Sequence, residues 1–108
     1  MKWFVASLLF ESTHSTITIV ERLWEDRLIL IQADELALAR EKALLIGATS
    51  EHTYVGEYGN VVSWKFRQIE RIFEIAEENL VSGIEVFSRF LLPAEAASLL
   101  SKIPDEFR

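Results

Sequence analysis

The fold is decided by residues 2–11, KWFVASLLFE, an apolar run near the start of the chain. Successive side chains of an extended strand point to opposite sides of a sheet. Here both alternating sets are apolar: one holds Trp3, Val5 and Leu9, and the other holds Phe4, Ala6, Leu8 and Phe10. The run therefore predicts a buried strand with apolar cover on both sides. Because Glu11 ends it and no small-x-small cleavage site follows, we do not interpret it as a secretion signal.

Two further segments lead away from this strand. Residues 12–16 are polar and turn-forming, and they predict a hairpin loop. Residues 17–32 are rich in β-branched and aromatic side chains, which favours extended chain. Because this segment is longer than the usual strand of about 5 to 6 residues, we expect Glu25-Asp26-Arg27 to mark a bend, a bulge or an exposed end.

The middle of the chain combines a helix with a hairpin. Residues 35–46 contain good helix formers, and Asp34 and Gly47 are residue types that begin and end helices. Residues 52–58 then predict a strand. Gly59-Asn60 is typical of a two-residue turn into the strand that follows.

The segment from Trp64 to Leu80 fits two structures. Its apolar residues follow helical spacing, namely Phe66, Ile69, Ile72, Phe73, Ala76 and Leu80. In a plain strand, Trp64 and Phe66 share one phase, whereas Ile69, Phe73 and Ile75 share the other. A strand therefore needs a bulge near Arg67-Gln68 that inverts the side chains after it. The pattern alone favours neither structure.

The last segments predict one more strand and one more helix. Residues 84–91 follow Gly83 as a strand, and Pro93 suits the first turn of a short helix through Lys102. Together the segments predict an α+β fold, with a mainly antiparallel sheet of about five strands and two helices packed on one face. The length suits a single domain over residues 1–108.

Four short motifs carry a resemblance to a known family. They are WFVA at 3–6, LWEDR at 23–27, VSWKF at 62–66 and GIEVFSR at 83–89. Together they resemble the small bacterial domain-of-unknown-function family 4288 over residues 1–92. The resemblance implies no activity, cofactor or site residue. It does imply that the segment after the Trp-x-Phe motif is extended, which favours a strand over residues 69–75.

Charge and cysteine content argue against several classes of function. The chain carries 17 Asp and Glu against 11 Lys and Arg, a formal net charge of −6. The basic residues are scattered, so we expect no binding to nucleic acid, where phosphate neutralisation dominates affinity. No apolar stretch reaches the roughly 20 residues that cross a bilayer, so we expect no membrane contact. The absence of cysteine excludes disulfides and thiolate chemistry, and it suits a cytoplasmic location.

Few residues could carry chemistry. His14 and His52 lack the spacing of a metal-binding pair, so we expect surface residues and neither a metal nor another cofactor. Glu11, Glu25 and Glu85 would form an acid and base pair only if the sheet brought two of them together. We expect them to pair with arginines on a solvated face instead. The chain is therefore expected to be non-enzymatic, and a small hydrolase using these carboxylates is an alternative.

The apolar strands predict self-association. Two helices do not easily cover both faces of such a sheet, and monomers rarely leave an apolar patch larger than roughly a few hundred Å² in water. We therefore expect a protein-interaction domain that forms a homodimer through its second sheet face. An acidic immunity or inhibitor-type protein that binds a basic protein partner is a further alternative. The candidate partner or ligand surface comprises Glu11, Trp24, Glu25, Arg27, Trp64, Arg67, Glu85 and Arg89.

Overall fold

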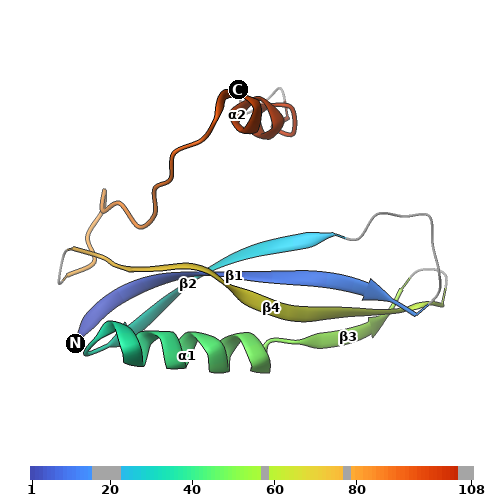
Figure 1. Cartoon of the computed structure of the whole chain (residues 1–108), viewed down its shortest axis with the longest axis horizontal. Helices are drawn as coiled ribbons and strands as arrows, with labels where there is room; N and C mark the ends of the chain where they lie inside the picture. The colour runs from blue at the N-terminus through green and yellow to red at the C-terminus, as the bar shows by residue number, and fades with distance from the viewer. Residues whose placement is uncertain (16–22, 57–58, 77–78, 105–108) are drawn as a thin grey trace.

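The computed structural model describes residues 1–15, 23–56, 59–76 and 79–104. In chain order the elements are β1 (Lys2–His14), β2 (Trp24–Ala33), α1 (Leu36–Thr49), β3 (His52–Val55), β4 (Val61–Glu74) and α2 (Pro93–Leu100). The described strands form one antiparallel sheet of four strands in the order β2-β1-β4-β3 (Figure 1). The predicted α+β class and antiparallel sheet are confirmed, with four described strands in place of the expected five or so.

β1 is a central strand of the sheet, which confirms the prediction from residues 2–11. It pairs with β2 on one side and with β4 on the other. We call the side of the sheet that holds Phe4, Ala6, Leu8 and Phe10 the helix face. We call the side that holds Trp3, Val5, Ser7 and Leu9 the open face. Members of both sets are fully buried, because a central strand is flanked by side chains from both neighbours.

β1 is also longer than predicted. It continues to His14, where it still pairs with Val62 of β4. The prediction of a hairpin loop over residues 12–16 is therefore wrong for residues 12–14. The long partner strand supplies backbone hydrogen bonds that the polar side chains alone did not reveal.

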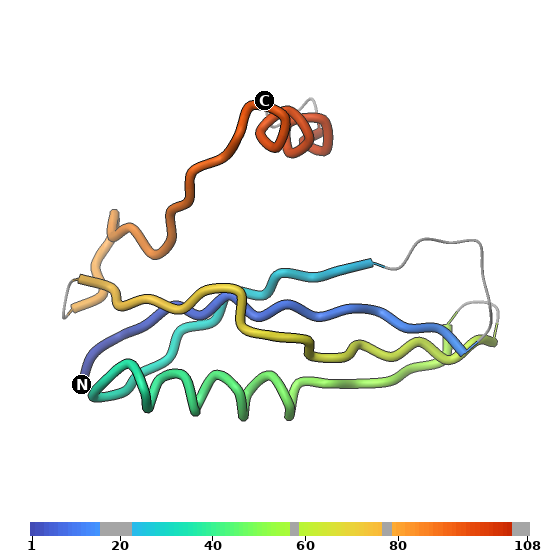
Figure 2. The backbone as a smooth tube through the Cα atoms, in the orientation of Figure 1, coloured from blue at the N-terminus to red at the C-terminus, as the bar shows by residue number. Residues whose placement is uncertain are grey.

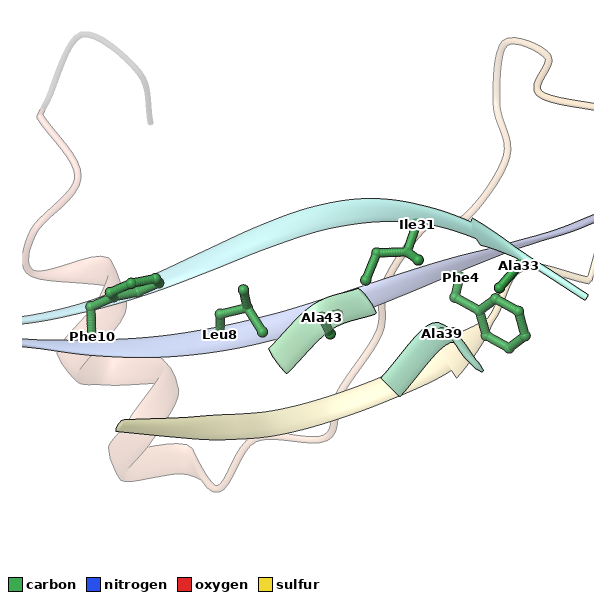
Figure 3. Close-up of a cluster of buried hydrophobic side chains, with 8 residues drawn as sticks. Phe4, Leu8, Phe10, Ile31, Ala33, Ala39 and Ala43 are labelled. Atoms are coloured by element: carbon green, nitrogen blue, oxygen red, sulfur yellow. The ribbon is translucent and has the colours of Figure 1, made fainter. Parts of the chain in front are cut away.

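α1 covers the helix face and completes the core. The core cluster consists of Phe4, Ala6, Leu8, Phe10, Ile31, Ala33, Ala39 and Ala43 (Figure 3). The helix contributes Ala39 and Ala43, whose small side chains let it lie close to the strands. Burying a phenylalanine or leucine side chain fully is worth about 1.5–3 kcal/mol. The larger side chains of β1 are therefore the main source of stability in this layer.

Gly47 lies inside α1 and does not cap it, so the prediction that this residue ends the helix is wrong. The helix runs on to Thr49, and Ser50 is the C-cap residue. A Cβ atom at Gly47 would lie 2.7 Å from ring carbons of Phe66 on β4. Glycine is therefore present because the helix and the phenylalanine ring approach each other too closely for a side chain.

β4 is a strand from Val61 to Glu74, so the first part of the segment that the sequence left open is a strand, and no described residue from 75 to 80 is helical. Its register with β1 shifts between Ser7 and Leu8 and again between Leu9 and Phe10. Each shift leaves one residue of β4, Glu70 and Arg67 respectively, without a partner on β1. Because of these bulges, residues spaced by three along the strand can share a face. Phe66, Ile69 and Ile72 accordingly all pack against the core cluster.

The bulge predicted near Arg67-Gln68 is thus confirmed, but the bulge at Glu70 was not predicted. Ile69 pairs with Leu8 and lies on the helix face. Phe73 pairs with Val5 and lies on the open face. The prediction that Ile69 and Phe73 share a face is therefore wrong, because the second bulge inverts the strand again.

Two other local predictions need correction. β2 begins at Trp24 and pairs with β1 with no register shift, so of the three alternatives for Glu25-Asp26-Arg27 the bend and the bulge are wrong and the end of a strand is confirmed. Residues 16–22, at the start of the predicted extended segment, lie outside the described residues. β3 ends at Val55, and the backbone N–H of Gly56 donates to the Asn60 carbonyl oxygen at 2.7 Å. The connection is therefore longer than the predicted two-residue turn.

The C-terminal arm, which we define as residues 84–104, differs most from prediction. Residues 84–91 pair with no described strand, so the predicted strand is wrong. α2 is a helix as predicted, but its backbone approaches none of the described strands, and it stands apart from the sheet (Figure 2). Of the two described helices only α1 packs on the sheet, and the expected packing of two helices on one face is not found among the described residues. No helix in the described ranges has the length and apolar character to cross a membrane.

Candidate interaction surface

The open face carries an apolar row across the sheet. The strand register places Leu30 of β2 and Phe73 of β4 on either side of Val5. The ring of Phe73 lies 5.6 Å from the ring of Phe87 in the C-terminal arm, measured between centroids. We call Leu30, Val5, Phe73 and Phe87 the apolar row. It places side chains from three strands and the arm in one layer on the side of the sheet away from α1.

Leu28 extends the apolar surface on β2. It lies opposite Ser7, two residues from Leu30 on the same face of the strand. The exposed fractions of Leu28 and Leu30 are 48% and 49%. A single exposed leucine is ordinary, but neighbouring apolar side chains left in water are typical of interaction surfaces.

Arg71 fixes the arm at the other end of this surface. It lies opposite Ser7 on β4, and its Nη1 donates to the carbonyl oxygen of Ser88 at 3.0 Å. Its guanidinium carbon also lies 5.5 Å from the centroid of the Phe87 ring. The first part of the arm is therefore held against the open face by side chains of β4.

Three of the predicted surface residues come together at the polar end of the open face. Glu11 lies opposite Trp24 in the strand register. Arg67 Nε donates to Glu11 Oε1 at 3.0 Å, and Arg67 is the residue at one of the β4 bulges. Between this group and the leucines, the Ser7 hydroxyl donates to Asp26. The open face therefore has an apolar part and a polar part.

Three other predicted residues lie on the helix face instead. Glu25 lies opposite Phe10, and Arg27 Nε donates to Glu25 Oε1 at 3.0 Å. The Arg27 guanidinium carbon lies 4.3 Å from the centroid of the Phe10 ring. Trp64 packs against the core cluster. These residues border the core, so they are not part of the surface that contains Glu11.

The three glutamates considered as an acid and base pair do not come together in the structure. Glu11 is on the open face and Glu25 is on the helix face, so their side chains point to opposite sides of the sheet. Each takes part in an ion pair with an arginine, as expected. Glu85 and Arg89, the last two predicted surface residues, are exposed in the C-terminal arm. Arg89 lies with its guanidinium carbon 5.9 Å from the Phe87 ring centroid.

The two histidines occupy strands. His14 ends β1, so the prediction that it lies in a loop is wrong, and its Nδ1 is buried with no hydrogen-bond partner among the described residues. His52 begins β3 and is exposed, with its Nδ1 3.3 Å from the Ser50 carbonyl oxygen. Within the described ranges, no three His, Cys, Asp or Glu side chains are grouped to hold a metal ion.

Sequence reasoning named Trp24 as a surface residue but did not name Leu28 or Leu30. A signal was present, because both leucines share the phase of Trp24 along β2. The sequence did not show on which face of the sheet these alternate residues lie. The pairing of β2 with β1 places it on the open face.

Comparison with known proteins gives one result. A family model described as Domain of unknown function (DUF4288) matches residues 3–88. The match begins in β1, extends into the C-terminal arm and ends before α2. Neither the comparison with curated proteins nor that with solved structures found a match. Because the family model spans most of the sequence, the chain belongs to the DUF4288 family.

Proposed function

We propose that the chain is a non-enzymatic interaction domain that self-associates through its open face. The observation that carries the proposal is the position of Leu28 and Leu30. They are neighbours on one face of β2, each about half exposed, and Leu30 belongs to the apolar row on the side of the sheet that α1 does not cover. A second copy would cover them.

The gain from covering these leucines is sizeable. Each retains about half of its exposure, so removing the remainder is worth about 1 kcal/mol per side chain. A two-fold interface uses the same patch from both copies, so four leucines contribute about 4 kcal/mol in total.

The polar end of the open face supports the same proposal. Interfaces between proteins usually have an apolar centre and a polar rim. The Glu11–Arg67 ion pair and Asp26 lie beyond Leu28 along the strands, where a rim would be. Trp24, with an exposed fraction of 56%, offers a large side chain at the same end. Tryptophan is among the residues enriched in the energetically dominant parts of interfaces.

The net charge of −6 predicts how self-association depends on salt concentration. Two acidic copies repel each other, and salt screens that repulsion. Self-association should therefore be unchanged or strengthened when salt is raised. An acidic inhibitor bound to a basic partner would respond in the opposite direction.

A double variant tests the proposal. Leu28→Glu/Leu30→Glu places two charges on each copy where the partner would exclude water, at a cost of several kcal/mol. We expect the dimer dissociation constant to rise by about 100-fold or more, measured by sedimentation at low and high salt. The matched control is Leu38→Glu/Leu45→Glu, which changes two exposed leucines of α1.

The control should leave the dissociation constant within about threefold of the unmodified chain. Circular dichroism establishes that both double variants are folded. If Leu28→Glu/Leu30→Glu does not fold, the single change Leu28→Glu takes its place. Equal effects of the β2 and α1 variants on association would refute the proposal.

A further inference from the structure

We infer that two copies exchange their C-terminal helices, so that α2 of each chain packs on the open face of the other. This inference rests on the proposed self-association and specifies how it occurs. It assigns the occupant of the open face to a named segment of a second copy. Each copy then supplies both a sheet surface and the helix that covers its partner's sheet.

The first observation is the exposure of the arm. Phe90 is completely exposed, at 105%, and the exposed fraction of Leu92 is 69%. No residue of α2 is buried. Apolar side chains are unfavourable in water, and packing against a partner would lower the free energy by burying them.

The second observation is that α2 has one apolar stripe. Within α2, Ala96, Leu99 and Leu100 follow i, i+3 and i+4 spacing, and Leu92 and Ile103 flank the helix at its two ends. Residues with this spacing lie on one side of a helix. The helix is also capped locally, because the Glu95 carboxylate accepts the backbone N–H of Leu92 at 2.9 Å. α2 is therefore a formed helix whose apolar side is suited to an apolar surface such as that of Leu28 and Leu30.

The third observation is the direction of the arm. Its first part is held on its own sheet, where Phe87 contacts Phe73 and Arg71 donates to Ser88. Leu92 is extended, with φ −71° and ψ 153°, and it precedes Pro93. A residue before proline is disfavoured in helical conformation, which agrees with the extended backbone of Leu92. α2 follows this extended link, and its backbone approaches none of the described strands of its own sheet (Figure 2).

The fourth observation is the amount of surface. The chain exposes 8217 Å², about 2,100 Å² more than the roughly 6,100 Å² expected for a compact monomer of its mass. Its radius of gyration is 17.0 Å, against about 13 Å for a compact domain of this length. A stable interface buries about 800 Å² on each partner. The excess surface is therefore more than enough for an exchanged dimer.

Single cysteines in the full-length chain test the exchange, because the natural sequence contains none. Leu28→Cys in one chain and Leu99→Cys in a second chain with a different tag are co-expressed and then oxidised gently. We expect the mixed disulfide between the two tagged chains. It should exceed by about tenfold the product of a control pair that joins Leu99→Cys to Leu38→Cys on α1.

A chain that carries both Leu28→Cys and Leu99→Cys completes the test. Exchange predicts disulfide-linked dimers, whereas a disulfide within a monomer would show that α2 folds back on its own sheet and would overturn the inference. If Leu28→Cys instead links only to itself across two copies, self-association stands and the exchange fails. A monomer with no cross-link between chains would overturn both proposals.

Discussion

Phe10→Ala is expected to lower the free energy of unfolding by about 3–5 kcal/mol. Phe10 is completely buried, at 0% exposure, on the helix face of β1. Its ring lies 5.5 Å from the ring of Phe66 and 4.3 Å from the guanidinium carbon of Arg27. The substitution therefore removes apolar burial, an aromatic pair and a cation–π contact, and it leaves a cavity. Urea unfolding followed by circular dichroism measures the change.

Phe10→Leu is the matched control for this experiment. It keeps most of the apolar volume and loses only the ring contacts, so its cost should stay below about 1.5 kcal/mol. The ratio of the two effects separates packing from aromatic interactions. A loss below about 1 kcal/mol for Phe10→Ala would contradict the placement of this ring in the core.

Ala43→Glu is expected to destabilise the chain by at least about 4 kcal/mol, which would remove most of the stability of a typical small domain. Ala43 has no exposed surface and lies in the core cluster between α1 and the strands (Figure 3). A glutamate there would be too large for the space and would carry a charge into an apolar layer. The expected result in thermal unfolding is loss of the cooperative transition.

Ala37→Glu is the control on the same helix. Ala37 is exposed near the start of α1, where a negative charge interacts favourably with the helix dipole. Its free energy of unfolding should change by less than about 0.5 kcal/mol. Similar unfolding curves for the two glutamate variants would contradict the packing of α1 on the helix face.

The sequence was sufficient to predict the central strand and the first helix. Both depend on local patterns: two apolar phases in residues 2–11, and helix formers after Asp34. The end of that helix was not predictable in the same way. Gly47 resembles a cap in sequence, but its role depends on Phe66, a residue of a distant strand.

β4 shows why apolar spacing can mislead. Two bulges place Phe66, Ile69 and Ile72 on one face at intervals of three residues, a spacing that also fits a helix. One bulge was predicted, because the strand interpretation required an inversion. The other depends on the register with β1, which no local pattern reports. Residues 84–91 show the reverse error, since a strand pattern is present without a described strand to pair with it.

For the candidate surface, the sequence predicted the behaviour of individual residues but not which of them share a face of the sheet. The expectation that carboxylates pair with arginines is confirmed for Glu11 with Arg67 and for Glu25 with Arg27. The predicted residues do not form one surface, because adjacent positions on β1 and β2 point to opposite faces. The face on which a residue lies depends on the strand register. That register is known only once β2, β1 and β4 are paired in the structure.

Sedimentation equilibrium of the unmodified chain at low micromolar concentration tests the central claim most directly. A chain whose open face is covered by a second copy should have a mass of twice 12.4 kDa. It should keep that mass when salt is raised. A mass of 12.4 kDa throughout the micromolar range would contradict the account, because Leu28, Leu30 and α2 would then remain in water without a partner copy.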